Sequence, residues 1–129
     1  MRWDYFRIKI IKCILSVSLM DETKKVLDKI NSYSSSQIDI RNYCRRKMEE
    51  RNIEEELLIS TLFSNSLYYI EEQEKTFNKI PEKRHKLVFK ISSKYSLIII
   101  VAFYPKDLKI INVIKTSKGA EKQWRKKFL

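Results

Sequence analysis

The chain has 129 residues, of which 43% are hydrophobic and 33% charged, and it carries a formal net charge of +11 with one glycine and two prolines. This length suits a single domain, and the scarcity of glycine and proline leaves little room for long flexible linkers or a glycine-rich nucleotide loop. The surplus of cations favours polyanionic partners, namely nucleic acid, an acidic protein or an anionic membrane.

Helices are predicted in the first part of the chain. Residues 3–19 mix strand-like alternation with helical spacing, and we favour a helix there. Asp21 is a candidate N-cap for a helix from Glu22 to Asn31. The serine-rich stretch 32–37 follows. It divides the chain into an N-terminal helical arm, residues 1–37, and an α+β domain, residues 38–129, which together are expected to form one compact unit.

Two more helices are predicted at the start of the main domain. Asp39 is suited to cap a helix from Ile40 to Arg51, and Asn52 is suited to end it in the left-handed conformation. Another helix is expected from Glu54 to Ser64, because its apolar residues lie on one stripe and its glutamates lie near its positive end.

The second half of the chain is predicted to form a sheet. Leu67 to Ile70 is a short strand candidate, and the polar stretch from Glu71 to Glu82 is expected to be a loop. Three runs rich in β-branched and aromatic residues then predict an antiparallel meander whose middle run, apolar on both faces, is the central strand. The runs are Lys83 to Ile91, Tyr95 to Tyr104 and Leu108 to Thr116.

These elements predict an α+β fold in which N-terminal helices pack on one face of a twisted antiparallel sheet of three to four strands, followed by a basic C-terminal tail. No run is long and uncharged enough to span a membrane, so we expect a cytoplasmic protein with no membrane partner. Cys13 and Cys44 lie in separate elements and are expected to be reduced thiols. The carboxylates lack the grouping of a metal site, so neither a metal nor another cofactor is expected.

One segment resembles a known family. Residues 43–53, Tyr-Cys-Arg-Arg-Lys-Met-Glu-Glu-Arg-Asn-Ile, resemble the motif His-Ala-x-x-Arg-Met-x-x-Arg-Gly-Ile of small toxin-like domains related to the barnase, colicin and RelE-type ribonuclease fold. The resemblance covers roughly residues 38–116 and implies a metal-independent endoribonuclease with an acidic antitoxin-like partner. The chain has Tyr43 where such domains carry histidine, and Asn112-Val113-Ile114 where they end in Thr-x-Tyr.

Metal-independent RNA cleavage needs a base, an acid and cations around the phosphate. His85 is the only histidine and lies between Arg84 and Lys86, so these three residues can form a phosphate-gripping cluster with Lys115, Thr116 and Ser117 of a neighbouring strand. Strand alternation instead places His85 on the face that packs against the helices and leaves the two cations outside. The candidate catalytic residues are His85, Tyr43, Lys115 and Ser117.

Other basic residues are candidates for contact with RNA phosphates. The tail interleaves basic and aromatic residues, a pattern that suits single-stranded RNA, although the helical spacing of Trp124 and Phe128 also suits docking on the body of the protein. Arginines of the helix over 40–51 can reach a phosphate or pair with nearby glutamates. The candidate nucleic-acid-binding residues are Arg45, Arg46, Arg51, Arg84, Lys86, Lys109, Lys122, Trp124 and Arg125.

Three functions are consistent with these patterns. The leading hypothesis is a toxin-like endoribonuclease that acts on RNA through a cationic sheet face, and it predicts cleavage without metal. The second is a non-catalytic nucleic-acid-binding module of the same fold, which predicts salt-sensitive binding without cleavage. The third is a protein-interaction module that binds an acidic partner such as an antitoxin and co-purifies with it.

Overall fold

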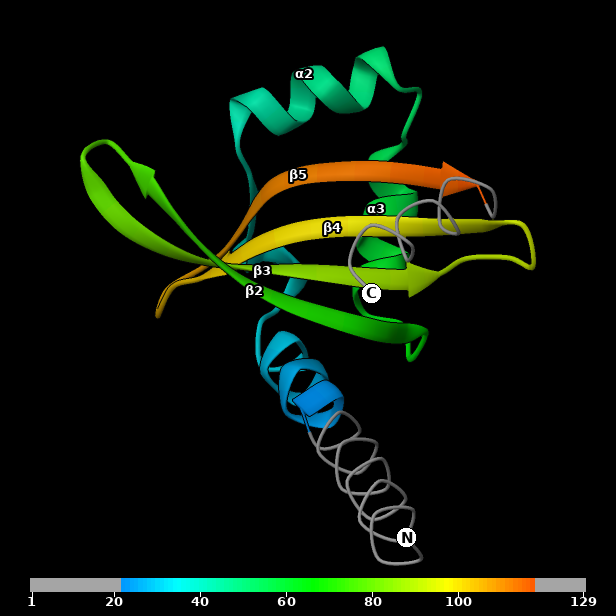
Figure 1. Cartoon of the computed structure of the whole chain (residues 1–129), viewed down its shortest axis with the longest axis horizontal. Helices are drawn as coiled ribbons and strands as arrows, with labels where there is room; N and C mark the ends of the chain where they lie inside the picture. The colour runs from blue at the N-terminus through cyan, green and yellow to red at the C-terminus, as the bar shows by residue number, and fades with distance from the viewer. Residues whose placement is uncertain (1–21, 118–129) are drawn as a thin grey trace, which may run out of the picture.

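Helices lie against one face of a twisted sheet in residues 22–117, the part of the chain that the computed structural model describes (Figure 1). In chain order the elements are a helix over residues 22–31, the 3-10 turn η1 (Ser35–Gln37), β1 (Ile38–Ile40), α2 (Asn42–Glu50), α3 (Glu55–Leu62), β2 (Leu67–Phe77), β3 (Ile80–Lys90), β4 (Tyr95–Phe103) and β5 (Leu108–Ser117). The predicted α+β class is confirmed. Within the described range, no helix has the length and apolar character needed to cross a bilayer.

Several predictions fall on residues 1–21 and 118–129, which lie outside the described range. They are the helix over residues 3–19, the Asp21 cap, the Cys13 thiol and the basic tail with Lys122, Trp124 and Arg125.

The sheet has the strand order β1-β5-β4-β3-β2. Strands β3 to β5 form the predicted antiparallel meander, with β4 at its centre, and β2 extends it by pairing antiparallel with β3. The predicted number of strands is too low and the sheet is mixed, because β1 adds in parallel to β5 and pairs Asp39 with Lys109. The predicted helix start at Ile40 with an Asp39 cap is therefore wrong. Ile38 to Ile40 is extended, and α2 begins only at Asn42.

The stretch predicted as a loop, Glu71 to Glu82, is instead the outer half of a long β2–β3 hairpin. Asn78 and Lys79 form its two-residue turn, and both have positive φ, at 50° and 65°, as a type I′ hairpin turn requires. Along the hairpin, glutamates of β2 face basic residues of β3, and Lys75 of β2 faces Glu82 of β3. The facing pairs are Glu71 with Lys86, Glu72 with His85 and Glu74 with Lys83. Figure 1 shows this hairpin twisting out of the sheet on the side where α2 begins.

The core lies between the helices and one face of the sheet. Alternate residues of β3, β4 and β5 are fully buried there together with residues of all three helices, and Ile30 from the helix over 22–31 is part of the same cluster. A bulge at Ile111 interrupts β5, because Ile110 pairs with Val101 whereas Asn112 pairs with Ile100. The bulge lets both Ile110 and Val113 face the core. We call the opposite side of the sheet the second face.

The left-handed stop after α2 is present at Asn52, whose φ is 54°. Asparagine tolerates this conformation better than other non-glycine residues, and the chain turns there directly into α3. The turn lets α2 and α3 contribute Met48 and Leu58 to one core.

Candidate functional site

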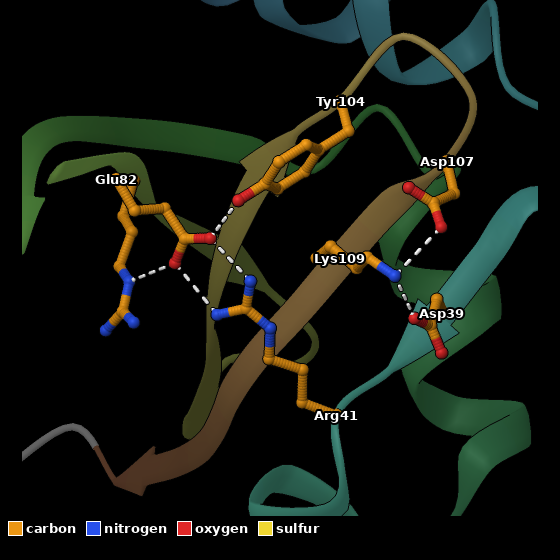
Figure 2. A network of polar contacts seen from close by, with 7 residues as sticks. Asp39, Arg41, Glu82, Tyr104, Asp107 and Lys109 are labelled. Carbon is orange, nitrogen blue, oxygen red and sulfur yellow. Dashed lines mark hydrogen bonds and ion pairs between the residues drawn. The ribbon is translucent and has the colours of Figure 1, made fainter. Parts of the chain in front are cut away.

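A buried carboxylate, Glu82, accepts four hydrogen bonds from three side chains on the second face of the sheet (Figure 2). The Arg41 guanidinium donates from Nη1 to Oε1 at 2.8 Å and from Nη2 to Oε2 at 2.5 Å. Arg84 Nε donates to Oε1 at 2.9 Å, and the Tyr104 hydroxyl donates to Oε2. Each carboxylate oxygen therefore accepts two hydrogen bonds, which uses its full capacity. We call these four residues the Glu82 cluster.

The fold brings the members of the Glu82 cluster together from distant parts of the chain. Arg41 follows β1, and its backbone N–H donates to the Ile110 carbonyl at 3.1 Å, which continues the hydrogen bonding between β1 and β5. Its guanidinium also lies 3.9 Å from the ring centroid of Phe77 at the hairpin tip. Tyr104 follows β4, and its carbonyl accepts a hydrogen bond from the Tyr33 hydroxyl at 2.7 Å. The cluster thus fastens the hairpin to the start of α2 and to the end of β4.

The electrostatics of the cluster favour an ionised Glu82 at neutral pH. The hydrogen bonds from Arg41, and then those from Tyr104 and Arg84, outweigh burial and lower the pKa of Glu82 from 4.5 to about 2. The hydrogen bond to this carboxylate raises the pKa of the Tyr104 hydroxyl. Two guanidiniums and one carboxylate leave the cluster with a surplus positive charge.

Arg84 is bound to Glu82 through only one of its three nitrogen atoms. Glu82 fixes its guanidinium through Nε, and its side chain is 17% exposed. No residue between 22 and 117 accepts a hydrogen bond from Nη1 or Nη2 of Arg84. These two donors are therefore held in one orientation and are available to an oxyanion, for which a planar guanidinium edge is well suited.

Lys109, predicted to contact RNA, forms ion pairs with two carboxylates beside the Glu82 cluster (Figure 2). Its ammonium lies 2.9 Å from Asp107 and also pairs with Asp39. The hydrogen bond to Asp39 is the main reason why the pKa of Lys109 is raised. Lys109 thus ties β1 to β5 and to the turn before β5.

His85 lies on the helix side of the sheet, as strand alternation indicates, and not with Arg84 on the second face. Its ring packs edge-on against Phe103 at a centroid distance of 5.1 Å, and Nε2 is 3.5 Å from Glu72. Nδ1 is buried without a hydrogen-bond partner. Burial lowers the pKa of His85 despite the neighbouring Glu72 carboxylate. The imidazole is therefore neutral at pH 7 and faces away from the Glu82 cluster.

The structure does not assemble the predicted phosphate-gripping cluster. After the bulge in β5, Lys115 pairs with Leu97 on the helix side, and its ammonium lies 4.6 Å from the centre of the Tyr95 ring. Leu97 pairs in turn with Phe89, which lies five residues along β3 from Arg84, or about 17 Å at the usual rise of a strand. Lys115 and the exposed Ser117 are thus far from Arg84 and on the other side of the sheet.

The predicted site residues of α2 make contacts that are separate from the Glu82 cluster. Tyr43 is half exposed, and the cations of Arg46 and Lys47 lie 5.8 and 5.7 Å from its ring centroid. Arg45 forms an exposed ion pair with Glu55 at 3.5 Å.

Arg51 and Lys86 complete the predicted set. Arg51 donates from Nη1 to Asn112 Oδ1 at 2.9 Å and to the Val113 carbonyl at 2.8 Å, beside the edge of β5. Lys86 shares the second face with Arg84 and lies opposite Glu71, and burial lowers its pKa.

Sequence reasoning missed Glu82, Arg41 and Tyr104. The only local signal was a single acidic residue at the start of a basic run, Glu82 to Lys86. Within residues 22–117, no group of three or more histidines, cysteines, aspartates or glutamates is arranged to hold a metal ion. Comparison of the chain with protein-family models, with curated proteins and with solved structures found no match.

Proposed function

We propose that this protein binds RNA through phosphate contacts on the second face of the sheet, with Arg84 as the principal phosphate ligand. The supporting observation is that Glu82 fixes the Arg84 guanidinium through Nε, while Nη1 and Nη2 have no acceptor among residues 22–117. A side chain that is already ordered loses less conformational entropy when it binds. The net charge of +11 adds a long-range attraction for any polyanion.

The geometry favours binding over cleavage. A general base works best with a pKa near the working pH, whereas the pKa of Glu82 is about 2 and both of its oxygens are fully hydrogen-bonded. His85, the other candidate, faces the helix side of the sheet. We therefore assign the second face a binding role that needs neither residue as an acid or a base.

A metal-independent endoribonuclease is the second candidate, and one observation favours it. A carboxylate, two guanidiniums and a hydroxyl converge at Glu82, and these are the kinds of group that phosphodiester cleavage uses as base, charge stabiliser and acid. The order α2, left-handed Asn52, α3 and then the meander also supports kinship with toxin-like ribonuclease domains. In this candidate a bound phosphate draws Arg84 away from Glu82 and thereby raises the basicity of the carboxylate.

Fluorescence anisotropy of a labelled single-stranded RNA, measured at several salt concentrations, tests the binding proposal. The wild-type chain is expected to bind with a steep negative dependence of log K on log salt, and Arg84→Gln should reduce that slope by about 1. Lys94→Gln is the matched control, because it removes an exposed cation from the β3–β4 turn, away from the cluster. Equal slopes for the two variants would contradict the role of Arg84.

Incubation of the same RNA with the wild-type chain in the presence of a metal chelator separates the two candidates. Intact RNA supports the binding module. Cleavage that is lost in both Glu82→Gln and Tyr104→Phe but retained in Glu55→Gln supports the endoribonuclease.

A further inference from the structure

The tip of the β2–β3 hairpin exposes two large apolar side chains. Phe77 is 39% exposed and Ile80 is 66% exposed, and they face each other across the two-residue turn. The exposed Lys75 lies beside them on the same face, and the exposed Lys79 lies in the turn between them, whereas Lys83 lies on the opposite face and pairs with Glu72 at 3.3 Å. An exposed apolar pair flanked by two cations has no evident role in the core of the protein.

The tip is continuous with the Glu82 cluster. Side chains two residues apart on a strand share a face, so Phe77 and Ile80 lie on the same face as Lys75, Glu82 and Arg84. Arg84 lies four positions along β3 from Ile80, which corresponds to about 13 Å. A single strand of nucleic acid, in which flat bases alternate with anionic phosphates, can therefore contact the hairpin tip and Arg84 at once.

The Phe77 ring is held in place. The Arg41 guanidinium lies 3.9 Å from the ring centroid, and the same guanidinium donates two hydrogen bonds to Glu82. The contact covers part of the ring, and 39% of the residue remains exposed. The tip thus presents an ordered aromatic surface.

We propose that the hairpin tip is a base-stacking site for single-stranded RNA. An unpaired base stacks on the exposed surface of Phe77 with Ile80 beside it, and the adjoining phosphates reach the lysines of the tip and Arg84. This inference rests on the proposed RNA binding and adds that the RNA is unpaired. Each base–aromatic stack is worth about 1–3 kcal/mol, so one such contact is useful in nucleic-acid binding. A stable protein partner needs roughly 800 Å² from each side, far more than two side chains provide.

The test compares the affinity of the full chain for a labelled 12-nucleotide RNA without self-complementarity and for the same strand in a duplex. Phe77→Leu keeps an apolar contact for Arg41 but removes the aromatic ring, and we expect it to weaken single-strand binding about 5- to 150-fold. The salt slope should not change, because no charge is lost. Ile80→Ser should also weaken binding, by a smaller factor and without a change in Tm, since Ile80 is 66% exposed.

Tyr95→Leu is the matched control, because Tyr95 is 43% exposed and also has a cation, that of Lys115, 4.6 Å from its ring centroid. It should change the affinity less than twofold. Wild-type binding to the duplex should be weaker than to the single strand and insensitive to Phe77→Leu.

Different failures have different meanings. If the wild-type chain binds RNA with the expected salt slope but Phe77→Leu and Tyr95→Leu have equal affinities, the stacking site is overturned while the proposed function stands. If the wild-type chain binds no RNA, both are overturned. In a third outcome, the chain sediments with vesicles of phosphatidylserine and phosphatidylcholine, and Ile80→Ser abolishes this sedimentation without any loss of RNA affinity. This outcome assigns the tip to a membrane surface and also overturns the stacking site.

Discussion

Replacement of Glu82 by glutamine removes the carboxylate shared by two arginines and a tyrosine while nearly preserving the side-chain volume. The pKa of Glu82 falls from 4.5 to about 2 on folding, and each pKa unit corresponds to about 1.4 kcal/mol. The side chain is only 3% exposed, so solvent screens these interactions little. The ionised carboxylate therefore contributes on the order of 3 kcal/mol at neutral pH, and removing one member of a buried ion pair costs a similar amount.

The sign of the pH dependence follows from the lowered pKa. A carboxyl group with a lower pKa in the folded state stabilises the fold fully above its unfolded value of 4.5, and this contribution is lost as the pH falls toward 2. Urea unfolding followed by circular dichroism should give a difference between the wild type and Glu82→Gln of about 3 kcal/mol at pH 7, and a clearly smaller difference at pH 3.

Glu55→Gln provides the control, because Glu55 forms an exposed ion pair with Arg45 and should change the stability by less than about 0.5 kcal/mol. A loss of unfolding free energy in Glu82→Gln that stays below about 1 kcal/mol at pH 7, or that does not shrink in acid, would refute the assignment of Glu82 as a buried, ionised residue that stabilises the fold.

Three further predictions concern single residues. Because His85 is the only histidine, its ring protons give an unambiguous NMR titration, and burial should place the midpoint below pH 6.5. The fold should then become less stable as the pH falls below 6.5, and a midpoint at or above 6.5 contradicts the packing described. Asn52→Ala should cost about 1 kcal/mol because φ is 54°, whereas Asn52→Gly should be close to neutral in urea unfolding; equal costs would argue against a left-handed stop. Burial raises the pKa of Cys44 to about 11. In a Cys13→Ser background, the Cys44 thiol should therefore react with a disulfide reagent at pH 8 about 100-fold more slowly in the folded chain than in urea, and equal rates would contradict its burial.

The meander was predictable because its strands carry their own signal. Tyr95 to Phe103 is rich in β-branched residues, and turn residues flank it on both sides. The stop at Asn52 was predictable for a similar reason, since few residues other than glycine adopt positive φ readily.

The hairpin was not predictable from hydrophobicity, because cross-strand charge pairs and tertiary contacts stabilise its outer half. Glu71, Glu72 and Glu74 read as loop residues in the sequence, yet each faces a basic residue across the ladder. Strand β1 was missed because it has three residues and depends on pairing with β5, which lies about 70 residues away in the sequence.

The candidate site was missed for a topological reason. Arg41, Glu82 and Tyr104 come from three elements, and only the twist of the hairpin and the pairing of β1 bring them together. The predicted link between Arg84 and Lys115 failed because the bulge at Ile111 shifts the alternation of β5 by one residue. A single inserted residue thus moves Lys115 to the side opposite Arg84.

The central claim is that single-stranded RNA contacts the second face of the sheet from the hairpin tip to Arg84. An NMR titration of the isotopically labelled full chain with a 12-nucleotide RNA tests this claim most directly, because the Arg84 Nε–H and the ring protons of Phe77 report on the two ends of that strip. We expect both sets of signals to shift, while the amides of Glu54 to Glu56, an acidic stretch at the start of α3, do not. Shifts confined to the helix side, or an Arg84 Nε–H signal unaffected at saturating RNA, would contradict it.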